Sequence, residues 1–186
     1  MFKTIQELKL HDHTCLAFNN QIEFFHCAIP FINQGLKNNE KCYIVTDDIT
    51  REEVLKHFKY LYRDGINPFD EISKEGRISI KHFKEVYLID NRFDVERTIE
   101  NYINLTNKAL SKGFTAVRVF AELSSSLKEF VNLEEFLSYE EKVDKYFDEN
   151  KFLAVCAYNK KQLPENFVSS ILKSHTIQID WLKTRL

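Results

Sequence analysis

The stretch FTAVRVFAELSSS, residues 114–126, decides the fold. It follows Gly113, a residue type common just after a helix, and its first half is rich in Val, Phe and Ala, as in a strand covered on both faces. Its second half brings Glu122 and a run of serines that begins at Ser124. We therefore predict a central strand of an open α/β sheet, whose carboxyl end is where such sheets bind ligands. The alternative is a solvated Glu122 beside serines that only cap the next helix.

Strand and helix patterns alternate along the rest of the chain. Apolar runs typical of strands cover Thr14–Phe18, Cys42–Thr46, Arg77–Lys81, Phe152–Tyr158 and, as a last edge strand, Ile177–Trp181. Helical spacing covers Asn20 to Gly35, Thr50 to Gly65, Phe93 to Gly113, Leu133 to Asn150, and the segment after Pro164. Residues 1–12 are predicted as a short helix or arm, and residues 83–91 as a loop with local order. The alternation predicts one α/β domain over residues 1–186, with three layers and a mainly parallel sheet that has helices on both faces.

Composition and charge exclude several classes of protein. Hydrophobic residues are 44% and charged residues 29% of the 186, as in a globular domain. The net charge is −2 and no basic stripe is present, so we expect no nucleic-acid partner. The N-terminus lacks the apolar core of a signal peptide, and no run approaches the roughly 18 apolar residues of a membrane span. We expect a cytoplasmic protein without a membrane partner, whose four cysteines are reduced and mostly buried.

The turn after the first predicted strand argues against a nucleotide. Phosphates in α/β domains usually rest on a glycine-rich turn at this place. Here the turn reads FNNQIEFF, residues 18–25, and has neither glycine nor lysine. Side chains on Asn19, Asn20 and Gln21 would obstruct close approach of a phosphate to the backbone. We therefore predict no ATP or GTP binding and no cofactor.

Histidines and cysteines raise two chemical alternatives. In an extended segment His11, His13 and Cys15 would point to one face and offer three ligands for zinc. The sequence shows no obvious fourth ligand, so we expect no bound metal. A Cys–His nucleophile could combine Cys15 or Cys156 with His13 or His175, but their apolar neighbours do not suggest the electropositive, accessible setting that a reactive thiol needs.

Strand ends predict a small pocket. Cys156 and Tyr158 share one side of their strand, and Tyr158 stands at its carboxyl end. Together with His13, Cys15 and Glu122, they would place polar groups on an apolar wall that suits a small, mostly apolar ligand. The alternative is that Tyr158 simply packs against a helix.

Six short motifs occur in a collinear order over about residues 10 to 180. They are His13-Thr14-Cys15, Pro30–Val45, Arg92–Arg97, Phe114–Ser124, Cys156–Pro164 and His175. In this order and spacing the chain resembles the MEDS domain, a sensory domain named from methanogens, methylotrophs and the dichloromethane-responsive repressor.

This resemblance implies a RecA-like α/β fold without a working phosphate loop. It also implies a sensor of small molecules, including hydrocarbon derivatives, of a kind found fused to DNA-binding, kinase or anti-sigma modules. With the neighbouring Ser124 added, the candidate ligand-binding residues are His13, Cys15, Glu122, Ser124, Cys156, Tyr158 and His175.

Our leading hypothesis is a non-catalytic signalling domain that senses a small molecule. It would act through a partner protein, such as a kinase, an anti-sigma factor or another regulator, and could form a homo-oligomer. One alternative is a metal- or thiol-dependent enzyme that uses His13 and Cys15. The other is a protein-interaction scaffold that uses its exposed helical faces.

Overall fold

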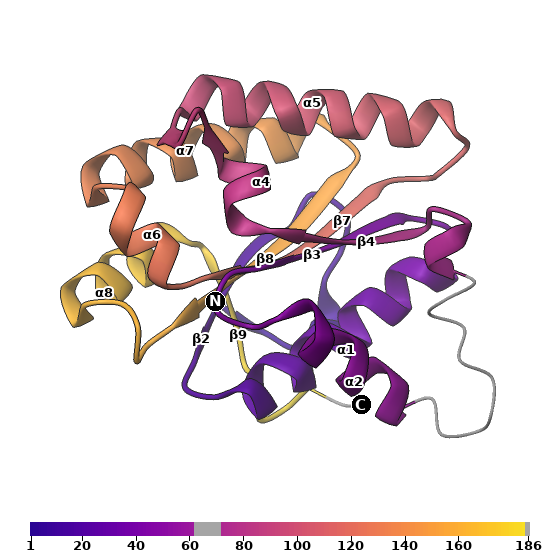
Figure 1. Cartoon of the computed structure of the whole chain (residues 1–186), viewed down its shortest axis with the longest axis horizontal. Helices are drawn as coiled ribbons and strands as arrows, with labels where there is room; N and C mark the ends of the chain where they lie inside the picture. Colours follow the sequence, from indigo (N-terminus) through magenta and orange to yellow (C-terminus); the bar gives the residue numbers. More distant parts are fainter. Residues whose placement is uncertain (62–71, 185–186) are drawn as a thin grey trace.

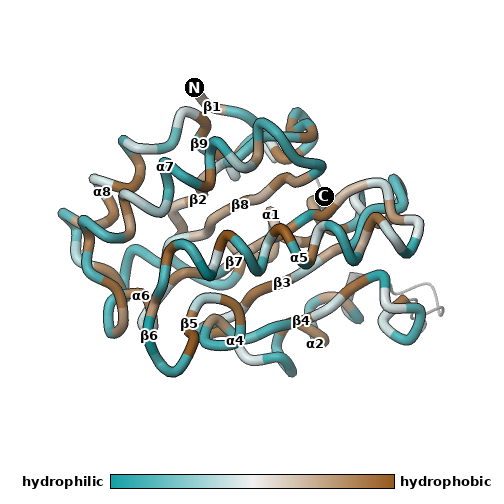
Figure 2. Tube along the Cα trace, turned by 90° about the horizontal axis from the view of Figure 1, so that it is seen from above, coloured by the Kyte–Doolittle hydropathy of each residue, from teal (hydrophilic) through white to brown (hydrophobic). Residues whose placement is uncertain are grey.

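The computed structural model describes residues 1–61 and 72–184, built around a seven-stranded sheet. The strands are β1 (Phe2–Lys3), β2 (His13–Phe18), β3 (Lys41–Thr46), β4 (Ile78–His82), β7 (Val117–Leu123), β8 (Phe152–Asn159) and β9 (Ile177–Ile179). All neighbours in the sheet are parallel, and their order is β1-β9-β2-β8-β7-β3-β4 (Figure 2). A separate antiparallel ribbon pairs β5 (Leu88–Ile89) with β6 (Arg92–Phe93). The prediction of a mainly parallel α/β sheet is confirmed.

Helices cover both faces of the sheet (Figure 1). One layer holds α1 (Gln21–Lys37) and α2 (Arg51–Leu61). The opposite layer holds α4 (Phe83–Tyr87), α5 (Val95–Ser111), α6 (Ser125–Phe130), α7 (Leu133–Glu149) and α8 (Glu165–Ser174). A 3₁₀ turn, η1 (Ile5–Glu7), lies beside α1. Of the described helices, none has both the length and the apolar character that crossing a bilayer would require.

The central strand β7 separates two apolar cores. Successive side chains of a strand point to opposite faces. Val119 and Leu123 therefore belong to the core on the side of α5 and α7, whereas Phe120 packs against α1. All seven residues of β7 are buried, as the Val, Phe and Ala content predicts for a strand covered on both sides.

The layer of α1 contains a buried ion pair that the sequence pattern does not reveal. Arg118 of β7 pairs with Glu40, and its Nη1 donates to the carbonyl of Phe31 at 3.2 Å. A side chain at Gly35 would have its Cβ only 2.6 Å from Cδ of Arg118 and 2.7 Å from Sγ of Cys42. Glycine at this position therefore allows α1 to pack closely over the ion pair.

Local signals placed most helix boundaries correctly. Asn20 caps α1 by accepting from the backbone N–H groups of Ile22 and Glu23 at 3.0 and 3.1 Å. The helix contains Pro30 and continues past Gly35 to Lys37. The predicted end of the second helix at Gly65 lies outside the described residues.

Two predicted elements need correction, and a third prediction offered two forms of which one is found. The strand expected at the edge, β9, lies between β1 and β2, because the N-terminal arm adds an outer strand in which Phe2 pairs with Gln178. Residues 1–12, predicted as a short helix or arm, form an arm that contains this strand and the 3₁₀ turn η1. Residues 83–91, expected to be a loop, form α4 and the first strand of the ribbon, because His82 caps the helix by accepting from the N–H of Lys84 at 3.2 Å.

Candidate functional site

Four side chains of metal-binding types meet beneath α7 and α8. His13 begins β2, Glu140 lies on α7, Cys156 lies in β8 and His175 follows α8. All four residues are buried, and their ligating atoms lie within 4.8 Å of one another. Nε2 of His13 is 3.4 Å from both Sγ of Cys156 and Oε2 of Glu140, and Nε2 of His175 is 3.1 Å from the same Oε2. We call these four residues the polar cluster.

Strand register and helix periodicity build the polar cluster. In the β2–β8 pair His13 lies opposite Ala154 and Cys15 opposite Cys156, so His13 and Cys156 are diagonal neighbours on one face. On α7 Glu140 falls within the stripe of buried residues that includes Phe136 and Val143. A carboxylate inside an otherwise apolar helical stripe is the sequence signal that could have identified Glu140.

Hydrogen-bonding groups around the polar cluster orient its side chains. Nδ1 of His13 lies 2.6 Å from Oδ1 of Asp144, and Nδ1 of His175 donates to the carbonyl of Ile171 at 3.0 Å. The hydroxyl of Tyr158 donates to Oε1 of Glu140 at 3.2 Å. The imidazole rings of His13 and His175 thus turn Nδ1 outward and Nε2 toward the centre of the polar cluster.

Electrostatics make Glu140 the anion of the polar cluster. Burial pushes the pKa of Glu140 upward, but His175 and His13 outweigh burial and hold that pKa below its usual value. Burial alone would lower the pKa of His175, yet the Glu140 carboxylate raises it. Burial, with a smaller contribution from Glu140, raises the pKa of the Cys156 thiol well above its usual range. Cys156 is therefore a poor nucleophile, because attack requires the thiolate.

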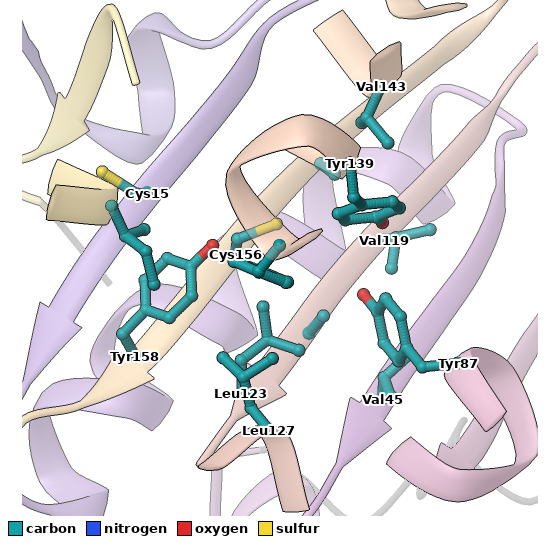
Figure 3. Close-up of a cluster of buried hydrophobic side chains, with 14 of the residues drawn as sticks. Cys15, Val45, Tyr87, Val119, Leu123, Leu127, Tyr139, Val143, Cys156 and Tyr158 are labelled. Atoms are coloured by element: carbon teal, nitrogen blue, oxygen red, sulfur yellow. The ribbon is translucent and has the colours of Figure 1, made fainter. Parts of the chain in front are cut away.

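Neither His11 nor Cys15 joins the polar cluster. Sγ of Cys15 lies 3.7 Å from the carbonyl of Ile177 on β9, and Figure 3 shows its sulfur turned away from Cys156. His11 donates from Nδ1 to the carbonyl of Phe147 at 2.6 Å. The ligand trio considered from alternation in the sequence is thus not assembled, because the chain turns at His11, whose φ is 76°.

Glu122 and Ser124 lie in a different site, between the loops that follow β3 and β7. Oε2 of Glu122 accepts from the backbone N–H groups of Asp47 and Ile49 at 2.8 and 2.9 Å, and the other carboxylate oxygen, Oε1, accepts from the hydroxyl of Ser124 at 3.1 Å. Glu122 is fully buried rather than solvated, and burial raises its pKa to about 7. Its carboxylate ties the two loops together.

The predicted single pocket is therefore divided between the two faces of the sheet. Glu122 pairs in register with Ala157, and Leu123 pairs with Tyr158. Figure 3 shows Leu123 and Tyr158 on the same side, together with Cys156. The structure brings together His13, Cys156, Tyr158 and His175, places Cys15 beside them, and separates them from Glu122 and Ser124.

The turn after β2 is filled by a carboxylate of the chain itself. Oε2 of Glu23 accepts from the backbone N–H of Asn19 at 2.9 Å, and Oε1 accepts from Nδ2 of Asn20 at 2.9 Å. Glu23 is buried. The donors that would meet a phosphate at this place already bind an anion.

A cavity of about 370 Å³ lies over the sheet beside α4 and α5. Its apolar wall comes from strands β3 and β7 and from the buried sides of the two helices. It is lined by Tyr43, Val45, Lys81, Glu85, Val86, Asn101, Tyr102, Asn104, Leu105, Lys108 and Val119. Sequence reasoning missed this cavity, because it depends on how far α5 stands from the strands.

Comparisons with known proteins address the family and the fold. The family model described as the methanogen/methylotroph, DcmR sensory domain (MEDS) matches residues 12–176. No curated protein sequence matches the chain. Among solved structures, the flagellar accessory protein FlaH from Methanocaldococcus jannaschii is similar with a TM-score of 0.60 at 15% identity, over 92% of this chain and 71% of that one. The fold is therefore RecA-like.

Proposed function

Because the chain belongs to the MEDS family of sensory domains, we propose that it is a non-catalytic domain that binds a small molecule and signals through a partner protein. The observation that carries this proposal is the cavity beside α4 and α5. Its volume of about 370 Å³ suits a small ligand, because pockets for drug-sized molecules span about 300 to 1,000 Å³.

The lining of the cavity indicates the chemistry of its ligand. Tyr43, Val45 and Val119 supply an apolar wall from the sheet. Asn101 and Lys108, on α5, supply polar groups that would orient one end of the ligand. We propose a small molecule with an apolar body and one polar group, such as a hydrocarbon derivative.

A hydrogen bond links the cavity wall to the neighbouring helix α7. Tyr102 lines the cavity from α5, and its hydroxyl lies 2.9 Å from that of Tyr139 on α7. A ligand that moves Tyr102 would therefore alter the contact between α5 and α7. We propose that a partner protein binds the outer faces of these two helices and responds to this change.

Two observations support a sensor over an enzyme. Glu23 occupies the turn where nucleotide-binding α/β domains hold phosphates, which argues against ATP hydrolysis there. All four cysteines are buried thiols, and burial raises the pKa of Cys27 and Cys42 to about 12. Such thiols are not poised for nucleophilic attack.

A pair of tryptophan variants on α5 tests the ligand site. Leu105→Trp would fill the cavity, whereas Ile103→Trp places the same bulk at an exposed position of the same helix. Short alcohols, haloalkanes and short carboxylates would be screened against each protein by ligand-observed NMR and thermal shift. We expect at least one class to bind wild type and Ile103→Trp in a saturable way, and not to bind Leu105→Trp. Equal binding to all three proteins, or binding to none of them, would contradict the proposed site.

A further inference from the structure

We propose that the polar cluster of His13, Glu140, Cys156 and His175 binds one divalent transition-metal ion of the zinc class. This inference goes beyond the proposed ligand function and does not depend on the cavity. It rests on the spacing of the four ligating atoms, on the groups that orient them, and on two buried atoms that make no hydrogen bond of acceptable geometry among the described residues.

The spacing suits tetrahedral coordination. Zinc binds nitrogen or oxygen at about 2.0 to 2.2 Å and sulfur at about 2.3 Å, which puts ligand atoms about 3.3 to 3.8 Å apart at tetrahedral angles. Three of the separations in the polar cluster are 3.1, 3.4 and 3.4 Å, and every separation is within 4.8 Å. Small movements of the side chains would bring all four atoms to these separations.

The outward hydrogen bonds are those of metal-binding histidines. A ligating imidazole usually donates its other ring N–H to a carboxylate or a backbone carbonyl. His13 has Asp144 in this role at 2.6 Å, and His175 has the carbonyl of Ile171 at 3.0 Å. With Nδ1 protonated in both neutral rings, each Nε2 presents a lone pair to the centre of the polar cluster.

Two atoms at the centre lack a hydrogen bond within the part of the chain that the structure describes. Oε2 of Glu140 and Nε2 of His175 are buried and make no hydrogen bond of acceptable geometry, although they lie 3.1 Å apart. When both rings are neutral and protonated on Nδ1, Nε2 of His13, Nε2 of His175 and this carboxylate oxygen all offer lone pairs to the same point. A metal ion at that point would bind all three atoms, in place of the proton that otherwise joins His175 to Glu140.

The charges of the site also balance. The Glu140 carboxylate and a Cys156 thiolate carry two negative charges, which a divalent ion neutralises, while both histidines stay neutral. Binding would release the thiol proton of Cys156, because the thiolate is the form that binds metal. Neutralisation matters here because an uncompensated buried charge is costly.

The donor set selects the class of metal. Two imidazoles, one thiolate and one carboxylate suit zinc, cobalt or a similar transition metal, whereas magnesium and calcium prefer oxygen ligands. Four protein ligands leave no open position for a substrate, as in structural rather than catalytic zinc sites. The ion would join α7 and α8 to strands β2 and β8.

This proposal revises the expectation from sequence that no metal is bound. That expectation rested on the missing fourth ligand beside His11, His13 and Cys15. Two of the ligands that the fold supplies, Glu140 and His175, come from helical segments far from His13 in the sequence.

Cobalt titration of the untagged, metal-stripped protein tests the proposal. We expect one Co²⁺ per chain, with intense tetrahedral visible bands and a thiolate-to-cobalt charge-transfer band, both lost when zinc is added. Cys156→Ala should abolish the charge-transfer band. Cys15→Ala is the matched control, since Cys15 is buried on the adjacent strand opposite Cys156, and it should retain the band.

Asp144→Asn covers the case in which a ligand variant does not fold. The Asp144 side chain is 47% exposed, so its replacement should leave the circular dichroism unchanged. We expect zinc affinity, measured by competition with a chelating dye, to fall about 10- to 100-fold, the range for partners of metal-binding histidines. Absence of the charge-transfer band in folded wild type would overturn the proposal. So would loss of the band in Cys15→Ala together with its retention in Cys156→Ala.

Discussion

Replacing Glu122 by glutamine should change how stability depends on pH. Glu122 is fully buried, and burial raises its pKa to about 7. The folded protein therefore keeps this proton to a higher pH than the unfolded chain, in which the ordinary value is 4.5. A raised folded pKa gives stability that is complete below the unfolded value and is lost as pH rises through the folded value.

The size of the effect follows from these two values. Between pH 5 and pH 8, ionisation of Glu122 should lower the free energy of unfolding by about 2 to 3 kcal/mol. Glutamine has nearly the same shape. Its carbonyl oxygen can accept from the N–H groups of Asp47 and Ile49, and its amide can donate to the hydroxyl of Ser124. Glu122→Gln should therefore keep the loop contacts and lose this pH dependence.

Urea unfolding of both proteins, followed by circular dichroism at several pH values, measures the difference. We expect the free energy of unfolding of wild type to fall relative to the variant by about 2 to 3 kcal/mol from pH 5 to pH 8. The variant should then equal or exceed wild type in stability at pH 8. Parallel pH profiles would refute the reasoning, because they would mean that Glu122 ionises alike in the folded and unfolded states.

Equilibrium dialysis with Mg-ATP should detect no binding, because Glu23 fills the turn after β2; micromolar binding located at residues 18–22 would contradict this. Native protein at pH 8 should not react with a thiol reagent within minutes, whereas all four cysteines should react in urea, because burial keeps them protonated and inaccessible. Arg118→Met should destabilise by about 3 to 5 kcal/mol in urea unfolding, because it leaves the Glu40 carboxylate buried and unpaired. Adding Glu40→Gln should recover part of this loss, and an equally severe double variant would count against the ion pair.

The order of strands and helices was predictable because local signals and burial agree. Residues 117–123 read as a covered strand since both of their faces pack against helices. Asn20 marked a helix start because its side chain accepts from N–H groups of the first turn. The outer strand β1 is only two residues long, Phe2–Lys3, so it shows no periodicity that could reveal it.

The candidate site was predictable in part. His13, Cys156, Tyr158 and His175 were identified, but their meeting with Glu140 depends on the β2–β8 register and on the position of α7. Strand ends alone suggested that Glu122 would join them. Adjacent residues of a strand point to opposite faces of the sheet. Tyr158 pairs with Leu123, so Glu122, one residue earlier, points to the other face.

The strand order also has a consequence for the kinetics of folding. Phe2 pairs with Gln178, and His13 pairs with Ala154, so the first two strands of the chain find their partners among its last two. During synthesis β1 and β2 remain without partners, with their hydrogen-bonding edges open, until residues 152–179 have been made. Contacts so distant in sequence slow folding and prolong the exposure of apolar edges. We expect the half of the sheet that contains β3, β7 and β4 to form first, and the seam between β2 and β8 to close last.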